Sequence, residues 1–264
     1  MVVFGQDTGK AYSYFETQAF QDVCKFNREM TLSGLYSDDL TTKSGDSVGR
    51  MQSGLYLWTE GSLGRDVEIT ETVRMNAPDA VLKCYLLAPE KPKYIDAAGG
   101  EVMCIPPTAP NKPGAMKFLN WIFKNEENYN LALYGLEGVD YEIIDGRIER
   151  SMPDDLFYEW MFRNVNYQLF PVETSQETID TYKTWDDDAI QSKAFGFRFN
   201  NENVLDIETK CNEVAGKKFL QICTGFVDFD TEYPKAVAAL KEAGIDEYVA
   251  EVQRQLDEFF AQQK

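Results

Sequence analysis

The acidic side chains are the most numerous groups in this 264-residue chain that could do chemistry. Its 44 Asp and Glu residues outnumber its 26 Lys and Arg residues, which gives a formal net charge of −18 at pH 7. Paired carboxylates can hydrolyse glycosidic bonds without histidine. Glu60 and Glu159 could form such a pair, but nothing in the sequence fixes their separation. Because so many acidic residues form pairs by chance, a carboxylate-dependent glycoside hydrolase is an alternative and not the leading interpretation.

Two acidic clusters suggest calcium, but neither fits it. Residues 186 to 188 are three consecutive Asp, whereas calcium loops space their ligands at alternate positions. Residues 228 to 232 fail as an EF-hand because Tyr233 occupies the position that needs glycine. We interpret the first cluster as a solvated surface and expect Asp230 or Thr231 to cap a helix. The sequence predicts no metal and no other cofactor.

Histidine is absent, and the chain has five cysteines. The first fact excludes Ser-His and Cys-His catalysis and all His-ligated metal sites. The cysteines are widely spaced with no Cys-x-x-Cys, so zinc or thioredoxin chemistry has no support. We expect most of them to be small buried hydrophobic residues. An odd number leaves at least one thiol unpaired unless a partner chain contributes; the five are Cys24, Cys84, Cys104, Cys211 and Cys223.

The composition, 44% hydrophobic and 13% aromatic, is that of a globular protein. No apolar run reaches the roughly 18 residues that a membrane helix needs. The acidic charge repels phosphate backbones and anionic lipid headgroups, which argues against nucleic acid as a partner. Neutral or cationic ligands suit this charge.

The segment from 113 to 134 predicts a long amphipathic helix followed by a hairpin. Asn111 is placed to cap the helix, and Gly135 to end it. Residues 141 to 149 contain two short β-prone runs around Asp145-Gly146, a pair that tolerates positive φ. The apolar face of the helix consists of Ala115, Phe118, Leu119, Ile122 and Phe123.

Other segments give simpler predictions. Residues 14 to 30 predict a helix with Phe15, Ala19, Val23, Phe26 and Met30 on one side. Residues 51 to 61 and 65 to 73 predict strands. Residues 204 to 223 predict a helix with a break at Gly216. The end of the chain predicts two helices separated by Gly244, with Asp246 capping the second.

Four parts of the sequence have distinctive residue patterns: Ala115-Met-Lys-Phe-Leu-Asn-Trp121, Tyr134-Gly-Leu-Glu-Gly138, Phe195-Gly-Phe-Arg-Phe-Asn200 and Leu240-Lys-Glu-Ala-Gly-Ile-Asp246 with Glu251-Val-Gln-Arg-Gln-Leu-Asp257. These patterns resemble bacterial extracellular solute-binding proteins, the ligand-capturing components of ABC importers. Within them the chain looks most like the lipoprotein-type branch (family 1) that carries a C-terminal domain of unknown function. One further stretch, at 158 to 171, resembles the same branch but departs from its pattern at Val165.

The resemblance covers residues 12 to 260 and implies the C-terminal half of such a protein. The implied fold class is α/β, a periplasmic-binding-protein-like (type II) lobe with a mixed sheet flanked by helices, truncated at the N-terminus. The implied domains are 1–83, the first part of the C-terminal lobe; 84–112, a hinge crossing with a remnant of the other lobe; and 113–264, the rest of the C-terminal lobe with its helical domain of unknown function.

The resemblance also implies a function without covalent chemistry. A neutral solute, with carbohydrate the favoured class, would be held between two lobes and delivered to ABC permease subunits by a monomer. Aromatic rings stack on sugar faces, and ligands collect beyond the carboxyl ends of strands, which directs attention to Trp58 and Glu60 at the C-terminal edge of the strand predicted at 51 to 61. The candidate ligand-binding residues are Trp58, Glu60, Tyr134, Glu137, Trp160 and Asn200.

The N-terminus, Met-Val-Val-Phe-Gly-Gln-Asp, contains neither a signal peptide nor a lipidation cysteine. The resemblance implies an extracellular, cell-surface lipoprotein, so we expect the sequence to be a piece of a longer protein. A cytosolic interaction protein is the competing interpretation. If one lobe and a hinge supply only part of the ligand shell, the affinity of this chain for solute is expected to be weak or absent.

Overall fold

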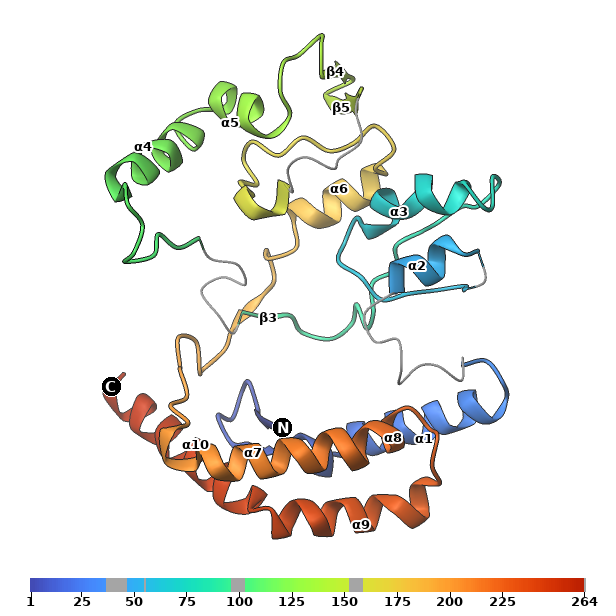
Figure 1. The fold of residues 1–264 in the computed structure, drawn as a ribbon, viewed down its shortest axis with the longest axis vertical. Coiled ribbons are helices and arrows are strands. Elements are labelled where there is room, and N and C mark those ends of the chain that lie inside the picture. Colours follow the sequence, from blue (N-terminus) through green and yellow to red (C-terminus); the bar gives the residue numbers. More distant parts are fainter. Residues whose placement is uncertain (37–46, 55, 96–102, 152–158, 264) are drawn as a thin grey trace. The chain divides into compact units, whose positions relative to one another are not determined.

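The described residues of the computed structural model (Figure 1) are 1–36, 47–54, 56–95, 103–151 and 159–263. The chain divides into two compact units. Unit 1 comprises Met1–Ser47, Pro92–Ala98 and Ala189–Lys264, and unit 2 comprises Val48–Lys91 and Gly99–Asp188. In sequence, unit 2 is therefore inserted between segments of unit 1.

Unit 1 is mostly helical. It begins with an antiparallel pair, β1 (Val2–Phe4) and β2 (Ala11–Ser13), followed by the 3-10 helix η1 (Tyr14–Glu16) and by α1 (Gln18–Leu32). Two short strands, β3 (Tyr94–Ile95) and β6 (Ile190–Gln191), pair in parallel. The remaining elements are η3 (Glu202–Val204), α7 (Leu205–Val214), the π-helical η4 (Ala215–Phe219), α8 (Leu220–Cys223), α9 (Phe229–Glu242) and α10 (Ile245–Gln262).

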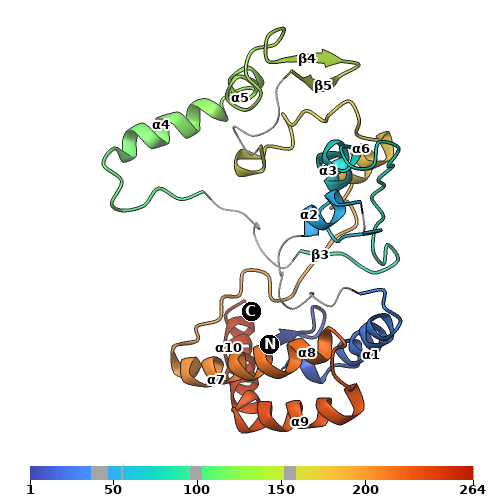
Figure 2. The same ribbon diagram turned by 45° about the vertical axis from the view of Figure 1, so that its right-hand side comes forward.

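The core of unit 1 is built from both ends of the sequence. The Phe219 ring of η4 stacks on Phe15 with 4.2 Å between ring centroids, and it meets Phe20 of α1 edge-on at 5.8 Å. Helices α7 and α9 lie side by side in both views (Figures 1 and 2). The least exposed side chains of this core are Cys24, Cys211, Phe219, Ile222, Leu240, Ile245 and Leu256.

Helix α1 confirms the helix predicted at 14 to 30, but the face predicted for it is wrong. Val23 and Phe26 are 46% and 54% exposed, whereas Phe20 and Cys24 are buried. The reason is tertiary packing, because the face that carries Phe20 and Cys24 continues to Asn27, which bonds to α8. A single-helix pattern cannot show which apolar stripe meets a partner from the other end of the chain.

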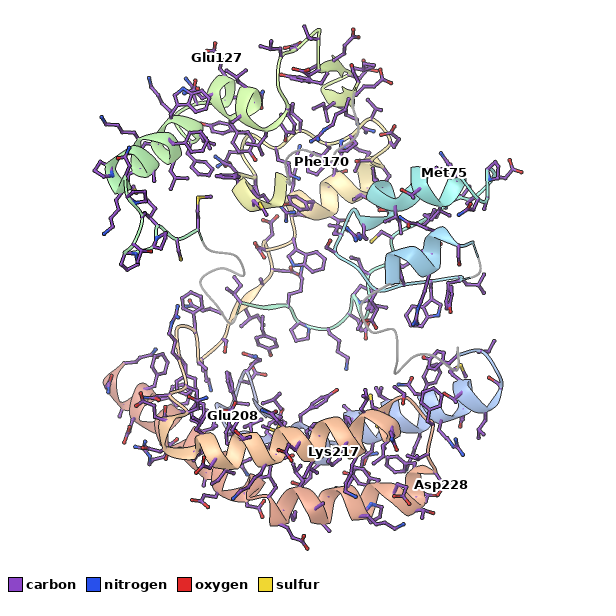
Figure 3. The ribbon with its side chains drawn as sticks, viewed as in Figure 1. Met75, Glu127, Phe170, Glu208, Lys217 and Asp228 are labelled. Atoms are coloured by element: carbon purple, nitrogen blue, oxygen red, sulfur yellow. The ribbon has the colours of Figure 1, made fainter. Side chains whose placement is uncertain are left out.

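The C-terminal helices follow the prediction closely. Gly244, at φ 99°, separates α9 from α10, and Gly216 lies in η4, where the helix changes type as the predicted break requires. Two caps differ from expectation. Asp228, labelled in Figure 3, caps α9 by accepting a hydrogen bond from the Thr231 N–H. Asp246 lies in the first turn of α10 instead of capping it.

Unit 2 consists of short elements with small local cores. Its described elements are α2 (Ser47–Gln52), α3 (Arg65–Arg74), α4 (Lys112–Ile122), α5 (Glu126–Leu133), β4 (Tyr141–Ile144), β5 (Arg147–Arg150), the 3-10 helix η2 (Glu159–Phe162) and α6 (Gln176–Lys183).

The strands predicted at 51 to 61 and 65 to 73 are wrong. The second is helix α3, and the described residues of the first belong to the end of α2 and an irregular segment. Ile69 and Val73 are four residues apart, so they share one helical face, and they form a small core with Met51. The alternation of Val67 and Ile69 suggested a strand, but the four-residue spacing of Ile69 and Val73 corresponds to the helix that forms.

The segment from 113 to 134 forms two helices in place of one. Asn111 caps α4 through the Gly114 N–H as predicted, but Asn125 starts a second helix by accepting from the Asn128 N–H. The hairpin of β4 and β5 is confirmed (Figure 2), with Asp145 and Gly146 at φ 52° and 76° in its turn. These elements share a core made of Ile122, Tyr129, Leu133, Tyr134, Tyr141 and Ile148.

The expected mixed sheet is not continuous among the described residues. Parallel and antiparallel pairing both occur, but in three separate two-stranded sheets, β1-β2, β3-β6 and β4-β5. The strands have only two to four residues each, which is too short for an extended ladder, and helices supply most of the buried surface. The two units are defined within this chain and do not test the lobes implied at 1–83, 84–112 and 113–264, so that division stays a prediction.

We expect Gly225→Ala to destabilise the chain strongly. Gly225 has φ 75°, and a Cβ there would lie 2.5 Å from the Asn27 carbonyl oxygen and 2.7 Å from the Arg28 Cα of α1. The left-handed backbone costs a residue with a side chain about 1–2 kcal/mol, and overpacking adds about 1–3 kcal/mol. Urea denaturation of the chain measures the loss.

Gly34→Ala is the matched control. Gly34 has φ 74°, but nothing lies within 4 Å of its Cβ position, so it bears only the backbone penalty. The difference between the two variants isolates the packing of Gly225 against α1. Equal losses of stability in the two variants would contradict this close approach.

Candidate functional site

The predicted ligand-binding residues are distributed over both units. Asn200 belongs to unit 1, and the other five belong to unit 2. Within unit 2, Tyr134 and Glu137 lie on one corner between α5 and β4, whereas Trp58 and Glu60 lie in the segment between α2 and α3. Trp160 is in η2, but its side chain is outside the part of the chain that the structure describes. The structure thus groups these residues into separate local sites.

Trp58 is 63% exposed, and Glu60 is exposed beside it. The described residues around them form no strand, so their accessibility does not come from a strand end as the sequence suggested. It comes from an irregular segment that holds the indole ring away from a core. An indole face with this much free surface is suited to stacking on a flat apolar ligand face.

The Tyr134 corner is built differently. Tyr134 is 6% exposed, its hydroxyl accepts the Leu169 N–H at 3.1 Å, and the Arg150 guanidinium lies 5.2 Å from its ring centroid. The corner turns through two glycines, Gly135 and Gly138, at φ 90° and 79°. Tyr134 therefore anchors the core of unit 2, and little of its ring is available to a ligand in this structure.

Glu137 is the exposed member of the same corner. Its backbone is bridged to Tyr141, and the Gly138 N–H donates to the Tyr141 carbonyl at 2.7 Å. Burial raises the pKa of the Tyr141 hydroxyl, and the negative charge of Glu137 raises it further. Tyr141 therefore stays neutral, and the Glu137 carboxylate faces solvent as a hydrogen-bond acceptor.

Asn200 borders a shallow hollow of about 270 Å³ against α10 in unit 1. The hollow combines aromatic rings, amides and charged groups. Phe197 and Phe259 meet edge-on with ring centroids 5.7 Å apart. The lining residues are Phe197, Arg198, Asn200, Asn203, Arg254, Gln255, Glu258, Phe259 and Gln262.

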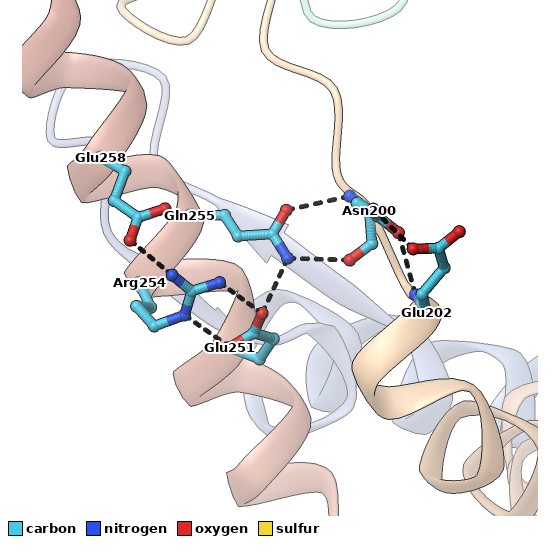
Figure 4. A network of polar contacts seen from close by, with 6 residues as sticks. All are labelled: Asn200, Glu202, Glu251, Arg254, Gln255 and Glu258. Carbon is cyan, nitrogen blue, oxygen red and sulfur yellow. Dashed lines mark hydrogen bonds and ion pairs between the residues drawn. The ribbon is translucent and has the colours of Figure 1, made fainter.

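A polar network fixes the walls of this hollow (Figure 4). The Asn200 backbone N–H donates to Gln255 Oε1 at 2.9 Å, and Gln255 Nε2 donates back to the Asn200 carbonyl at 2.8 Å. Gln255 Nε2 also donates to Glu251 Oε1 at 2.8 Å. The Asn200 side chain bonds to Glu202 through both its oxygen and its nitrogen. The loop at 200 is thereby clamped to α10.

The charged part of the network lies along one face of α10. Arg254 binds Glu251 through two nitrogens at 2.7 Å each and also contacts Glu258. The hydrogen bonds from Arg254, and then the one from Gln255, lower the pKa of Glu251 to about 2. The same contact raises the pKa of Arg254. Both groups stay charged across the physiological range.

These groups can bind a ligand, but the hollow contains no nucleophile with an activating base. The two phenyl rings offer apolar contact to a polyhydroxylated ligand, whereas the amide groups of Asn200 and Gln255 are already bonded within the network. Of these lining residues, Asn200 was predicted from the sequence, whereas Arg254, Gln255 and Phe259 were not. Their spacing of one and four residues on a helix was the available signal.

In the part of the chain that the structure describes, no group of three or more His, Cys, Asp or Glu side chains is arranged to hold a metal ion. Among the described helices, none combines the length and apolar character needed to cross a membrane.

Glu251→Gln is expected to lower the thermal midpoint by a few degrees at pH 7. The folded-state pKa of Glu251 lies below its ordinary 4.5, so the network contributes stability above that value. This contribution is lost as pH falls towards about 2, and the wild type and the variant should converge there. Melting curves between pH 7 and pH 2 measure the difference, with Glu173→Gln, an exposed turn carboxylate of unit 2, as the control for charge removal. A pH-independent difference would contradict the role of the Glu251 charge.

A family model matches the C-terminal part of the chain. Residues 193–261, which include the loop at Asn200 and all of α10 up to its last turn, match the family described as Domain of unknown function (DUF3502). The chain is 27% identical over 267 residues to a carbohydrate ABC transporter substrate-binding protein of Streptococcus pneumoniae serotype 4 (strain ATCC BAA-334 / TIGR4). That alignment covers 98% of this chain and 53% of the relative.

Solved structures give a consistent result. The N-glycan transport solute binding protein NgtS of Streptococcus pneumoniae matches with a TM-score of 0.75 at 21% identity, over 98% of this chain and 58% of NgtS. Its complex with Man5GlcNAc matches with a TM-score of 0.68 at 22% identity, over 100% of this chain and 59% of NgtS. The alginate-binding protein AlgQ2 without calcium ion matches with a TM-score of 0.60 at 16% identity, over 95% and 57%.

The chain thus spans about half the length of the relatives it matches. This share is consistent with the predicted match to one half of such a protein. The structural likeness confirms the predicted fold class as that of solute-binding proteins, although the sheet is divided. Together the sequence and structural matches confirm the predicted resemblance of this chain to the solute-binding components of ABC importers.

Proposed function

We propose that this chain is part of the solute-binding component of an ABC importer that captures a carbohydrate between two lobes and delivers it to permease subunits. One observation carries the proposal. Sequence similarity to a carbohydrate ABC transporter substrate-binding protein extends over 98% of the chain and is not limited to one motif.

The solute class follows from the structural neighbours. NgtS has been solved with Man1GlcNAc and with Man5GlcNAc, and AlgQ2 is named for alginate. These ligands are chains of sugar units, and the scaffold that this chain shares with the two proteins accommodates them. An oligosaccharide is therefore the solute that we propose, in preference to a peptide or another nutrient.

Within this proposal, Trp58 is the strongest candidate for a direct contact. Its exposed ring can stack on a sugar face, and Glu60 and Glu137 can accept hydrogen bonds from sugar hydroxyls. Asn200 would contribute by holding the wall of the hollow at α10, where its backbone is bonded to Gln255. Tyr134 would act mainly by holding the corner that presents Glu137, and Trp160 remains a proposed contact on the resemblance alone.

No catalytic step is part of the proposal. The relatives are named as binding proteins, which does not favour the glycoside hydrolase built on Glu60 and Glu159. We further propose that the whole protein acts outside the cell as a monomeric, lipid-anchored protein, with the permease as its partner. These last points rest on the importer assignment.

Saturation-transfer NMR with Man5GlcNAc tests the proposal directly. We expect binding by the chain to be weak, on the order of millimolar, because an incomplete shell around a sugar leaves many hydroxyl groups in water. Trp58→Ala should weaken it about tenfold, which is the worth of one stacked ring. Trp185→Ala, an exposed tryptophan in the same unit, should leave it unchanged.

Two results would overturn the proposal. One is saturation transfer from the protein to peptides of similar size with none to the oligosaccharide. The other is hydrolysis of the oligosaccharide that disappears in Glu60→Gln, since a binding protein does not cleave its ligand. Micromolar affinity measured by calorimetry would instead contradict the incomplete shell while leaving the solute class in place.

A further inference from the structure

Two cysteines from opposite ends of the sequence meet in the core of unit 1. Cys24 lies on α1 and is fully buried, and Cys223 is the last residue of α8 and is partly exposed. Both side chains belong to the same core cluster, they act on each other's pKa, and neither is part of a disulfide. The separation in sequence hides this pair from any motif search.

The surrounding contacts hold the two helices in this register. Asn27, one turn after Cys24 on the same face of α1, donates from Nδ2 to the Cys223 carbonyl at 2.7 Å. One turn further, Thr31 Oγ1 donates to the Thr224 carbonyl at 2.8 Å. These bonds satisfy carbonyls at the end of α8, which has no following turn to bond them.

The backbones themselves are in close contact just beyond this point. Arg28 donates from Nη1 to the Gly225 carbonyl at 2.8 Å, and there is no room for a side chain at Gly225. The end of α8 therefore cannot slide along α1. Two thiol groups carried by helices that are held together in this way need little backbone movement to form a bond.

We propose that Cys24 and Cys223 are a site of disulfide formation that covalently joins the N-terminal and C-terminal segments of unit 1. The inference does not depend on carbohydrate binding. Cys211 is buried in the same core with no thiol partner in the described part of the chain, and Cys84 and Cys104 belong to unit 2.

The chemistry assigns different roles to the two sulfurs. The hydrogen bond from Cys24 lowers the pKa of the Cys223 thiol, and it raises the pKa of Cys24 together with burial. Cys223 is also the more accessible of the two. Cys223 is therefore the first nucleophile, because the thiolate and not the thiol attacks a disulfide.

The oxidant is a low-molecular-weight disulfide. The Cys223 thiolate attacks one of its sulfurs, a mixed disulfide forms, and the first thiolate leaves. Cys24 then gives up its proton and attacks the Cys223 sulfur, which breaks the mixed bond and releases the second thiolate. The two protein S–H groups become one S–S bond, and the oxidant is reduced to two thiols that take up the two protons.

The bond would stabilise unit 1 in a specific way. Unit 2 is inserted between the segments that carry Cys24 and Cys223, so only non-covalent packing closes unit 1. A link between residues 199 positions apart (223 − 24) restricts the unfolded chain strongly. Oxidation should raise the thermal midpoint by about 5 °C or more.

Oxidised glutathione and non-reducing tryptic mapping test the proposal on the unaltered chain. Trypsin releases Cys24 in the peptide 11–25 and Cys223 in the peptide 219–235. The expected product is these two peptides linked, with the loss of the mass of two hydrogen atoms, and the link should disappear on reduction. Recovery of both peptides with unlinked thiols after oxidation would overturn the proposal, as would linkage of either one to Cys84, Cys104 or Cys211.

Variants separate the disulfide from general effects of oxidation. Cys223→Ser should abolish both the linked peptide and the rise in thermal midpoint, whereas Cys211→Ala should retain both. Since Cys24 is fully buried, Cys24→Ala is preferred over Cys24→Ser to avoid an unsatisfied hydroxyl. A rise in midpoint that persists in Cys223→Ser would contradict the assigned pair.

Discussion

The packing of α1 against the end of α8 is the contact on which unit 1 depends. Asn27 bonds to Cys223 across 196 positions of sequence, and the whole of unit 2 is inserted between them. Closing so long a loop costs conformational entropy when the first contact between the two chain ends forms. Further contacts between the same ends form without paying this entropy again. Close packing at Gly225 and around the buried Cys24 offsets this cost. The hydrogen bonds from α1 to otherwise unpaired carbonyls at the end of α8 offset it as well.

Contacts between the N-terminal and C-terminal segments also fix the position of α10. On one side, Gln253 accepts the Ala11 N–H of β2 at 2.7 Å and donates to the Gly9 carbonyl at 3.3 Å. On another side, Gln255 exchanges two bonds with the backbone of Asn200. Two glutamines two residues apart therefore connect α10 to the N-terminal hairpin and to the loop at 200, and the hollow keeps its shape because α10 is held from both directions.

Features set by local chemistry could be predicted from the sequence, and features set by distant partners could not. Asn111, the Asp145-Gly146 turn and Gly244 behave as expected, because caps and positive-φ positions depend on a few neighbouring atoms. The buried face of α1 could not be predicted, since it is chosen by α8. Residues 65 to 73 were predicted as a strand because Val67 alternates with Ile69. That alternation obscured the four-residue spacing of Ile69 and Val73, which builds one face of a helix.

The candidate site divides in the same way. Trp58 was found by residue type alone and has its ring surface free, at 63% exposed. Gln255 was missed, because its role exists only when α10 meets the loop at Asn200. Its amide nitrogen has two N–H groups, and both are already used, one by Asn200 and one by Glu251. A ligand gains little from donors that are already paired, so the network at α10 acts as a scaffold. New contacts to a sugar must therefore come from side chains whose surface is still exposed. Among the predicted residues that the structure describes, the Trp58 ring has the largest such surface.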